Sequence, residues 1–208
     1  MAIRFTCFFS YPHIDDAELM RNFVEKLSEA LQESLKLYLG KTDFFVDMKR
    51  LKPGYIFDET IAAALCQSLC LIAVYVPPYE DRSYCLREYE AMERLEAVRK
   101  AHLNRPELRD KGMIIPVVFR GLPDNLPAKI TQRYTYYNLS KFAPKAQSLL
   151  GNKKYASEID EIAQTIAELY KAVKNTDMCS DCDGFTLPAT AEIKPWRETL
   201  PPEPQFPR

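Results

Sequence analysis

Long apolar segments and an excess of charge of one sign are both missing from this 208-residue sequence. The longest continuous apolar run covers residues 69–76, whereas a helix that crosses a bilayer needs roughly 20 apolar residues. Lysine and arginine total 28 against 29 aspartate and glutamate residues, so the chain has no electrostatic footprint for nucleic acid. The first residues also lack the charged lead and the cleavage site of a secretory signal. We therefore expect a soluble, cytoplasmic protein that makes no direct contact with membranes or nucleic acids.

Common nucleotide and metal motifs are absent as well. No Walker loop, G-x-G-x-x-G or H-E-x-x-H motif occurs, which argues against phosphate-loop enzymes and metalloproteases. The six cysteines are Cys7, Cys66, Cys70, Cys85, Cys179 and Cys182. Cys179 and Cys182 form a single C-x-x-C without a second pair, so we expect no zinc site. For an intracellular chain we also expect no disulfides.

Strand-like and helix-like patterns alternate along the first 174 residues. They predict strands over 3–11, 43–47, 69–76, 113–119 and 135–137, and helices over 16–38, 56–67, 85–102 and 155–173. The run 69–76 is apolar throughout, which is typical of a central strand in a parallel sheet. Pro116 should limit hydrogen bonding in its strand or mark a bulge. Ser157 is a candidate N-cap for the last helix.

This order predicts an α/β, flavodoxin-like fold of three layers, in which helices flank a central, mostly parallel five-stranded sheet. Functional residues are then expected at the carboxyl ends of the strands. We assign residues 1–174 to this domain. Residues 175–208 are rich in proline and have no apolar period, so they are expected to be a tail or a linker. A linker to a further domain and an extended terminus packed on this one both fit that composition.

Four short motifs occur in order at the ends of predicted strands or within them. They are Phe8-Phe9-Ser10-Tyr11, Asp47 through Leu51-Lys52-Pro53-Gly54, Tyr79-x-x-x-Ser83-Tyr84-Cys85-x-x-Glu88, and Ile114-Ile115-Pro116. Together they resemble the three sequence boxes and the Ile-Ile-Pro strand of the TIR (Toll/interleukin-1 receptor) domain family. The resemblance extends over residues 3–173.

Enzymatic TIR domains, common in bacteria and plants, cleave NAD at the nicotinamide-ribose bond, and the resemblance implies a glycohydrolase or cyclase of this kind in immune or antiviral defence. It assigns catalysis to Glu88, which closes the third box. A carboxylate suits this reaction because positive charge develops on the ribose as the bond breaks. NAD is the substrate, and no cofactor or metal is implied. The implied substrate-binding residues are Phe9, Ser10, Tyr11, Asp47, Leu51, Pro53, Gly54, Tyr79, Ser83, Tyr84 and Cys85.

Two positions depart from the family pattern. Tyr84 replaces a tryptophan that is thought to stack on a base or the nicotinamide, and tyrosine stacks with less area. His13 stands near a position where a basic residue is frequent, so a phosphate contact there would need the protonated imidazole. Glu90 and Glu93 are nearby carboxylates, but their offsets of two and five residues rotate them away from the motif position.

Other classes of function fit the same residues. Non-catalytic TIR modules recruit partners through the Pro-Gly loop, and Glu88 would then be a replaceable, exposed helix residue near the helix start. Among other flavodoxin-like domains, a response-regulator receiver is disfavoured because Pro77 and Pro78 follow the central strand, where a phosphate-accepting aspartate is required. A nucleoside deoxyribosyltransferase relative stays open. TIR-TIR contacts can propagate head to tail, which implies a homo-oligomer or filament triggered by a sensor domain or a partner protein.

Overall fold

The computed structural model describes residues 3–14, 18–46, 57–102, 111–133, 135–142, 148–173, 182 and 184–197. The main elements are β1 (Phe5–Ser10), α1 (Glu18–Leu39), β2 (Phe44–Val46), α3 (Phe57–Cys66), β3 (Ser68–Tyr75), α4 (Ser83–His102), β4 (Ile114–Val118), β5 (Tyr137–Asn138) and α7 (Lys153–Val173). Short helical turns are η1 (Pro77–Asp81), η2 (Pro123–Asn125), α6 (Ala128–Thr131) and η3 (Thr190–Glu192). All of the strands and helices predicted from the sequence are present, with their ends shifted by a few residues.

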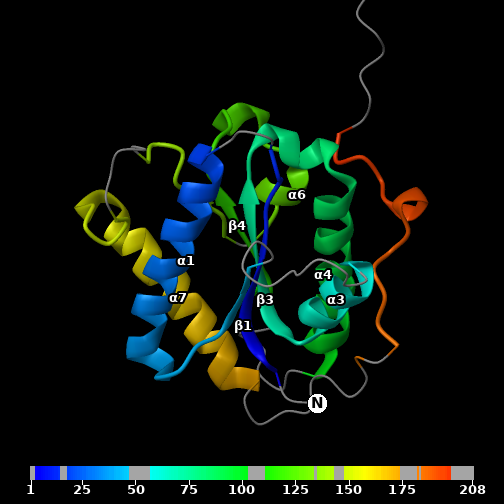
Figure 1. The fold of residues 1–208 in the computed structure, drawn as a ribbon, viewed down its shortest axis with the longest axis horizontal. Helices are drawn as coiled ribbons and strands as arrows, with labels where there is room; N and C mark the ends of the chain where they lie inside the picture. Colours follow the sequence, from blue (N-terminus) through cyan, green and yellow to red (C-terminus); the bar gives the residue numbers. More distant parts are fainter. Residues whose placement is uncertain are drawn as a thin grey trace, which may run out of the picture.

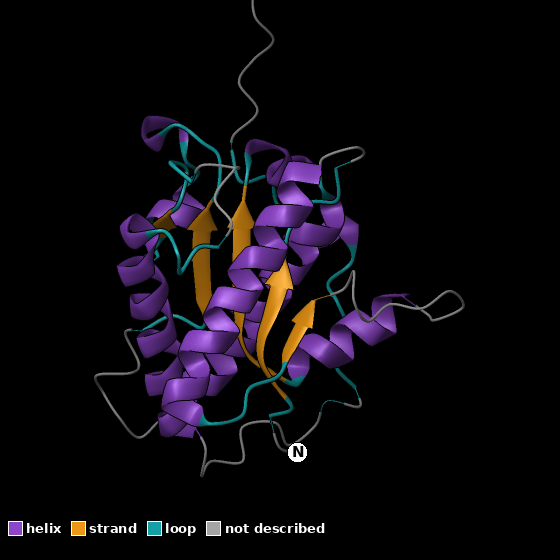
Figure 2. Ribbon diagram, turned by 60° about the vertical axis from the view of Figure 1, so that its left-hand side comes forward, coloured by secondary structure: helices purple, strands orange, loops and turns teal. Residues whose placement is uncertain are grey.

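The five strands form one sheet in the order β2-β1-β3-β4-β5, and every pairing is parallel. The predicted central strand is confirmed, because β3 lies in the middle of this order. Helices α1 and α7 lie on one side of the sheet, and α3 and α4 lie on the other (Figures 1 and 2). The predicted three-layer α/β fold is therefore confirmed. Because the strands are parallel, their carboxyl ends meet at one edge of the sheet.

Each face of the sheet contributes to its own apolar cluster. Phe23, Leu27 and Leu31 of α1 join Ile159 and Ile162 of α7 in the first cluster. The second cluster lies under α3 and α4 and includes side chains of β3 and η1. Leucine and phenylalanine at spacings of four residues place the apolar side of α1 against the sheet, as the sequence predicted. Burial on both faces explains why β1 and β3 read as nearly continuous apolar runs.

Two local predictions need correction. The register runs without interruption through Ala73↔Pro116 and Val74↔Val117, so Pro116 does not mark a bulge. It also lies before the pairing of β4 with the short edge strand β5, which starts at Val117. Ser157 is not the N-cap of α7, because the helix begins at Lys153. Asn152 takes this position: its side-chain oxygen accepts a hydrogen bond from the backbone N–H of Lys154 at 3.2 Å.

The prediction that the chain has no disulfides is wrong. Cys66 at the end of α3 and Cys182 are joined by a disulfide with a Cα–Cα distance of 5.8 Å. The two residues are 116 positions apart, so no local spacing pointed to this pair. Cys179, the other half of the C-x-x-C, lies outside the described residues. The cysteines in the described part of the chain that form no disulfide are Cys7, Cys70 and Cys85, and all three are buried.

The C-terminal segment packs against the domain. We call Cys182 together with residues 184–197 the C-terminal strap. It runs along the outer side of α3 and α4, in orange to red in Figure 1. Phe185, Leu187, Ile193 and Trp196 pack against the apolar cluster under α4. Arg94 of α4 also forms an ion pair with Glu192 at 3.0 Å. The strap therefore packs part of its apolar surface against the core on the α4 side of the sheet.

Candidate functional site

Glu88 lies on the buried side of α4. A helix repeats every 3.6 residues, so Cys85 and Met92, three residues before and four after, share this side, and both are fully buried. The Glu88 side chain itself is only 4% exposed. The alternative that Glu88 is an exposed helix residue is therefore wrong. A dipole role in the first turn does not apply either, because Glu88 is the sixth residue of the helix, which begins at Ser83.

A chain of hydrogen bonds reaches the Glu88 carboxylate from β1 and η1. The Ser10 hydroxyl, on the last residue of β1, donates to Oε2 of Glu88 at 2.6 Å. The Tyr79 hydroxyl lies 2.7 Å from Ser10 Oγ. Since the single hydroxyl hydrogen of Ser10 is used by Glu88, the Tyr79 hydroxyl donates to Ser10, its nearer partner. The Cys85 carbonyl oxygen at 3.3 Å is a second, weaker acceptor of the same hydrogen. The order of donation is thus Tyr79 to Ser10 to Glu88, and it joins three elements at the carboxyl end of the sheet.

The tyrosines near Glu88 stay protonated over the physiological range. Burial, together with electrostatic interaction with Cys85 and Glu88, raises the pKa of the Tyr79 hydroxyl well above its usual value. Burial also raises the pKa of Tyr84 to about 12. A tyrosine that does not ionise is a dependable donor, so the hydrogen bond from Tyr79 to Ser10 persists at neutral pH.

Aromatic rings gather beside this chain of hydrogen bonds. The exposed His13 ring lies 5.1 Å from the Tyr11 ring and 5.7 Å from the Tyr84 ring, measured between ring centroids. The backbone N–H of His13 donates to the Tyr84 hydroxyl at 2.5 Å. The segment after β1 and the start of α4 are therefore joined directly. This cluster contains the two positions at which the sequence departs from the family pattern.

The structure brings together only part of the predicted substrate-binding set. Ser10, Tyr79, Tyr84 and Cys85 lie around Glu88, and the Cys85 carbonyl is 3.3 Å from the Tyr79 hydroxyl. Tyr11, also in this set, packs on His13 beside Tyr84.

Other members of the predicted set lie elsewhere. Phe9 is 1% exposed and packs on Phe44 in the apolar cluster under α1. Ser83 is exposed at the start of α4. Four predicted residues lie outside the described residues, namely Asp47, Leu51, Pro53 and Gly54.

The two neighbouring carboxylates that the sequence disfavoured point to other partners. Glu90 pairs with Arg94, one turn further along α4, at 3.6 Å. Glu93 pairs with Lys129 and Arg133, at 2.5 and 2.6 Å. As the helix period predicts, neither side chain shares the buried side that carries Glu88.

The sequence patterns did not point to two residues next to the site. Trp196 of the strap packs against Tyr79 and Tyr89, with ring centroids 5.4 and 4.7 Å away. Arg197 pairs with Glu80, beside Tyr79, at 2.7 Å. One sequence feature could have pointed to them: the only tryptophan of the chain lies in a proline-rich segment that has no apolar period. A large aromatic side chain in such a segment indicates packing, but nothing in the sequence identifies its partner.

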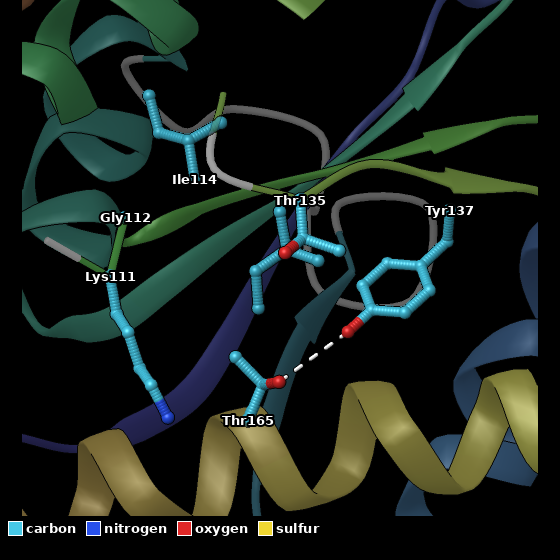
Figure 3. A pocket seen from close by; sticks show the side chains of 7 residues that line it. Lys111, Gly112, Ile114, Thr135, Tyr137 and Thr165 are labelled. Atoms are coloured by element: carbon cyan, nitrogen blue, oxygen red, sulfur yellow. Dashed lines mark hydrogen bonds between the residues drawn. The ribbon is translucent and has the colours of Figure 1, made fainter. Parts of the chain in front are cut away.

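Two cavities in the described part of the chain lie away from Glu88. One of about 150 Å³ lies between the sheet and α7, lined by Lys111, Thr135 and Tyr137, with the Tyr137 hydroxyl 3.4 Å from that of Thr165 (Figure 3). The other, of about 550 Å³, lies between α3 and the strap. No helix among the described residues is long and apolar enough to span a bilayer. Nor do these residues contain a group of three or more side chains suited to a metal ion.

Of three comparisons with known proteins, two found a match. A family model described as a TIR domain matches residues 7–150. The search among curated proteins found no match. A solved structure that resembles the chain is the TIR domain of the Toll-related receptor TRR-2 from Hydra magnipapillata. It shares 17% sequence identity, with 77% of this chain and 98% of that chain covered and a TM-score of 0.48.

Proposed function

We propose that this chain, which belongs to the TIR domain family, cleaves the nicotinamide-ribose bond of NAD with Glu88 as its catalytic residue. The family includes both NAD-cleaving enzymes and signalling modules. The observation that carries the proposal is the hydrogen bond from Ser10, which aims the Glu88 carboxylate at the carboxyl end of β1. This edge of a parallel sheet is where ligands of such folds bind.

The reaction needs little more than a positioned carboxylate. The bond between ribose C1′ and the nicotinamide nitrogen breaks, and its electron pair stays on the nitrogen, which leaves as neutral nicotinamide. A water molecule then bonds to C1′ and loses a proton, giving ADP-ribose. The Glu88 carboxylate stabilises the positive charge that develops on the ribose before the water adds. If a nitrogen of the adenine base adds instead of water, the product is a cyclic isomer.

Access to Glu88 supports regulation by assembly. Glu88, Ser10 and Tyr79 are each less than 5% exposed, so this conformation leaves little room for a dinucleotide at the carboxylate. Binding would require movement of the surrounding segments. TIR domains generally interact through TIR-TIR contacts, and such a contact can supply the free energy for this movement. We propose that self-association in an immune or defence response activates the enzyme.

The same burial favours one alternative, a non-catalytic signalling module. A carboxylate that is 4% exposed and accepts a hydrogen bond from Ser10 is also suited to a structural role that ties α4 to β1. In that case the domain would act through its surface alone. Loss of the carboxylate would then reduce stability rather than remove an activity.

The test is release of nicotinamide from NAD by the purified chain at high concentration, and also with the chain fused to an oligomer-forming partner. Replacing Glu88 by glutamine keeps the size of the side chain but removes the charge, and should lower the rate by about 10²–10³-fold. Glu90→Gln is the matched control, because Glu90 lies on the same helix and pairs with Arg94. A folded Glu88→Gln variant as active as the parent would contradict the catalytic role. No release by the parent, even in the fusion, would favour the signalling module.

A further inference from the structure

We propose that Trp196 is a positioning residue for Glu88, acting through Tyr79, and that the C-terminal strap is thereby part of the catalytic site. The inference rests on the function proposed above and deepens it. The matched family model ends at residue 150, so Trp196 lies outside the residues that it matches.

The first observation is the position of Tyr79 between the strap and the site. Its ring is fully buried and lies 5.4 Å from the Trp196 ring, at an interplanar angle of 31°. Its hydroxyl reaches Ser10, which in turn donates to Glu88. Trp196 is also held edge-on by Tyr89, 4.7 Å away. The tryptophan therefore fills the space against which Tyr79 packs, and Tyr79 carries the donor that orders Ser10.

The second observation is that η1, which carries Tyr79, is held from outside by the strap. Arg197 donates two hydrogen bonds to the Glu80 carboxylate, at 2.7 and 2.9 Å. Tyr75 donates a third to the same carboxylate at 2.5 Å. A helical turn of five residues has few hydrogen bonds of its own, and this one has no side-chain cap. Its placement therefore depends on these outside contacts.

A small shift of η1 is enough to disturb the carboxylate. The distance between the Tyr79 and Ser10 hydroxyls is 2.7 Å, and such bonds weaken steeply once the atoms move apart or out of line. Without the donor from Tyr79, the Ser10 hydroxyl can turn to other acceptors, and Glu88 loses its fixed orientation. Misplacement of a catalytic group by about 1 Å costs on the order of 10²-fold in rate. Trp196 does not touch Glu88, so its effect is expected in kcat rather than in KM.

The experiment compares three single variants for nicotinamide release under the conditions in which the parent is active. Trp196→Ala should lower kcat by about 10–100-fold and leave KM within about twofold. Trp196→Phe keeps an aromatic ring against Tyr79 and should recover most of the rate. Glu192→Gln is the control on the same strap, because Glu192 is exposed and pairs with Arg94. It should match the parent.

A double-variant cycle separates positioning from general destabilisation. If Trp196 acts through the hydroxyl chain, Trp196→Ala should have little further effect on kcat once Ser10→Ala has broken that chain. Far-UV circular dichroism and the urea midpoint show whether each variant is folded at the assay temperature. The positioning role would be overturned if the fold-losses in kcat of the two single variants multiplied in the double variant. A parent-like kcat for a folded Trp196→Ala variant would overturn it too, and in both cases the proposed function would stand.

Failure of the proposed function gives a different result. In that case the parent itself releases no nicotinamide in any assembled form. The double-variant cycle is then evaluated from the urea midpoints of the four proteins instead of from kcat. A double variant that loses less stability than the sum of the losses of Trp196→Ala and Ser10→Ala would show that Trp196 is coupled to the Ser10 hydroxyl. Additive losses would overturn that link as well.

Discussion

Helices α1 and α7 cover one face of the sheet almost entirely with apolar side chains, whereas the face under α3 and α4 contains buried charge. The buried charged residues in the described part of the chain are Glu88, Glu96 and Arg99, and all of them belong to α4. On the opposite face the buried polar residues of α1 are Ser28 and Ser34. Two helices pack on each face of the sheet, so the faces differ in the buried charged side chains of α4 rather than in their arrangement of helices.

Each buried charge on α4 has partners from another element, because an unpaired charge in the interior is strongly unfavourable. Glu88 accepts from Ser10 of β1. Glu96 pairs with Arg133 at 3.0 Å and accepts the backbone N–H of Met113 at 2.9 Å. The α1 side therefore supplies stability by apolar burial, while α4 joins distant segments through polar contacts. The candidate site lies on the face with polar contacts.

The largest expected effect is at Arg99. Its guanidinium donates to the carbonyls of Cys66 and Ser68, both at 2.6 Å, where α3 ends and β3 begins. Arg99→Ala would leave these carbonyls without partners in the interior and should lower the free energy of unfolding by about 3–5 kcal/mol. Urea denaturation followed by circular dichroism measures the loss. A loss below about 1 kcal/mol would show that the polar contacts of α4 are dispensable.

On the apolar face, Leu31→Ala should lower the free energy of unfolding by about 3 kcal/mol, because a fully buried leucine leaves a cavity. The same urea titration checks this value. Unlike Glu88→Gln, it should leave the kcat for nicotinamide release unchanged in the folded protein. A fall in kcat that exceeds the loss of folded protein would break the distinction between the two faces.

The strap adds a covalent tie to the α4 side only. Replacing Cys182 by serine removes the disulfide that closes a loop of 116 residues, and should lower the free energy of unfolding by about 2 kcal/mol. Reduction of the parent with dithiothreitol should lower its free energy of unfolding to that of the serine variant. The serine variant should not respond to the reductant. If the parent also fails to respond, the disulfide contributes nothing to stability.

Tyr89 should make the free energy of unfolding fall at alkaline pH. Burial raises its pKa from 10 to about 12, and its hydroxyl donates to the Lys129 carbonyl at 2.6 Å. The folded state keeps the proton to higher pH than the unfolded state, so this contribution is complete below pH 10 and is lost as pH rises to about 12.

The contribution amounts to about 1–3 kcal/mol and should be missing from the pH dependence of Tyr89→Phe. Urea midpoints of parent and variant between pH 9 and pH 12 give the comparison. Parallel curves would show that Tyr89 titrates alike in the folded and unfolded states.

The smallest effect is expected at the strap's surface. Glu192 pairs with Arg94 in solvent, and exposed pairs of this kind contribute little. Glu192→Gln should therefore leave the urea midpoint unchanged within error. A clear decrease would mean that the ion pair, rather than Trp196 and the disulfide, holds the strap.

Local patterns were sufficient for the main elements but not for their finer features. The spacing of leucines predicted α1, and the apolar run 69–76 predicted β3 as the central strand. The cap of α7 was misplaced because both Ser157 and Asn152 suit an N-cap, and only the helix start decides between them. The disulfide was missed because its cysteines are 116 residues apart.

For the candidate site, a motif indicated the residue but not its surroundings. Glu88 followed from the third sequence box, yet its burial was not anticipated. A signal existed, since Cys85, Tyr89 and Met92 form an apolar stripe on α4 that includes position 88. Its hydrogen bond to Ser10 joins residues 78 positions apart, which no helix or strand period can report.

The sequence by itself determined the alternation of strands and helices, the family, and Glu88 as the residue to test. These depend on local periodicity and on short motifs, which can be recognised in the sequence without knowledge of the tertiary structure. Only the tertiary structure decided that the strap lies against η1, and that Tyr79, Ser10 and Glu88 form one chain of hydrogen bonds. The physical reason is that such contacts join distant segments, and packing of the whole domain selects them from many local alternatives.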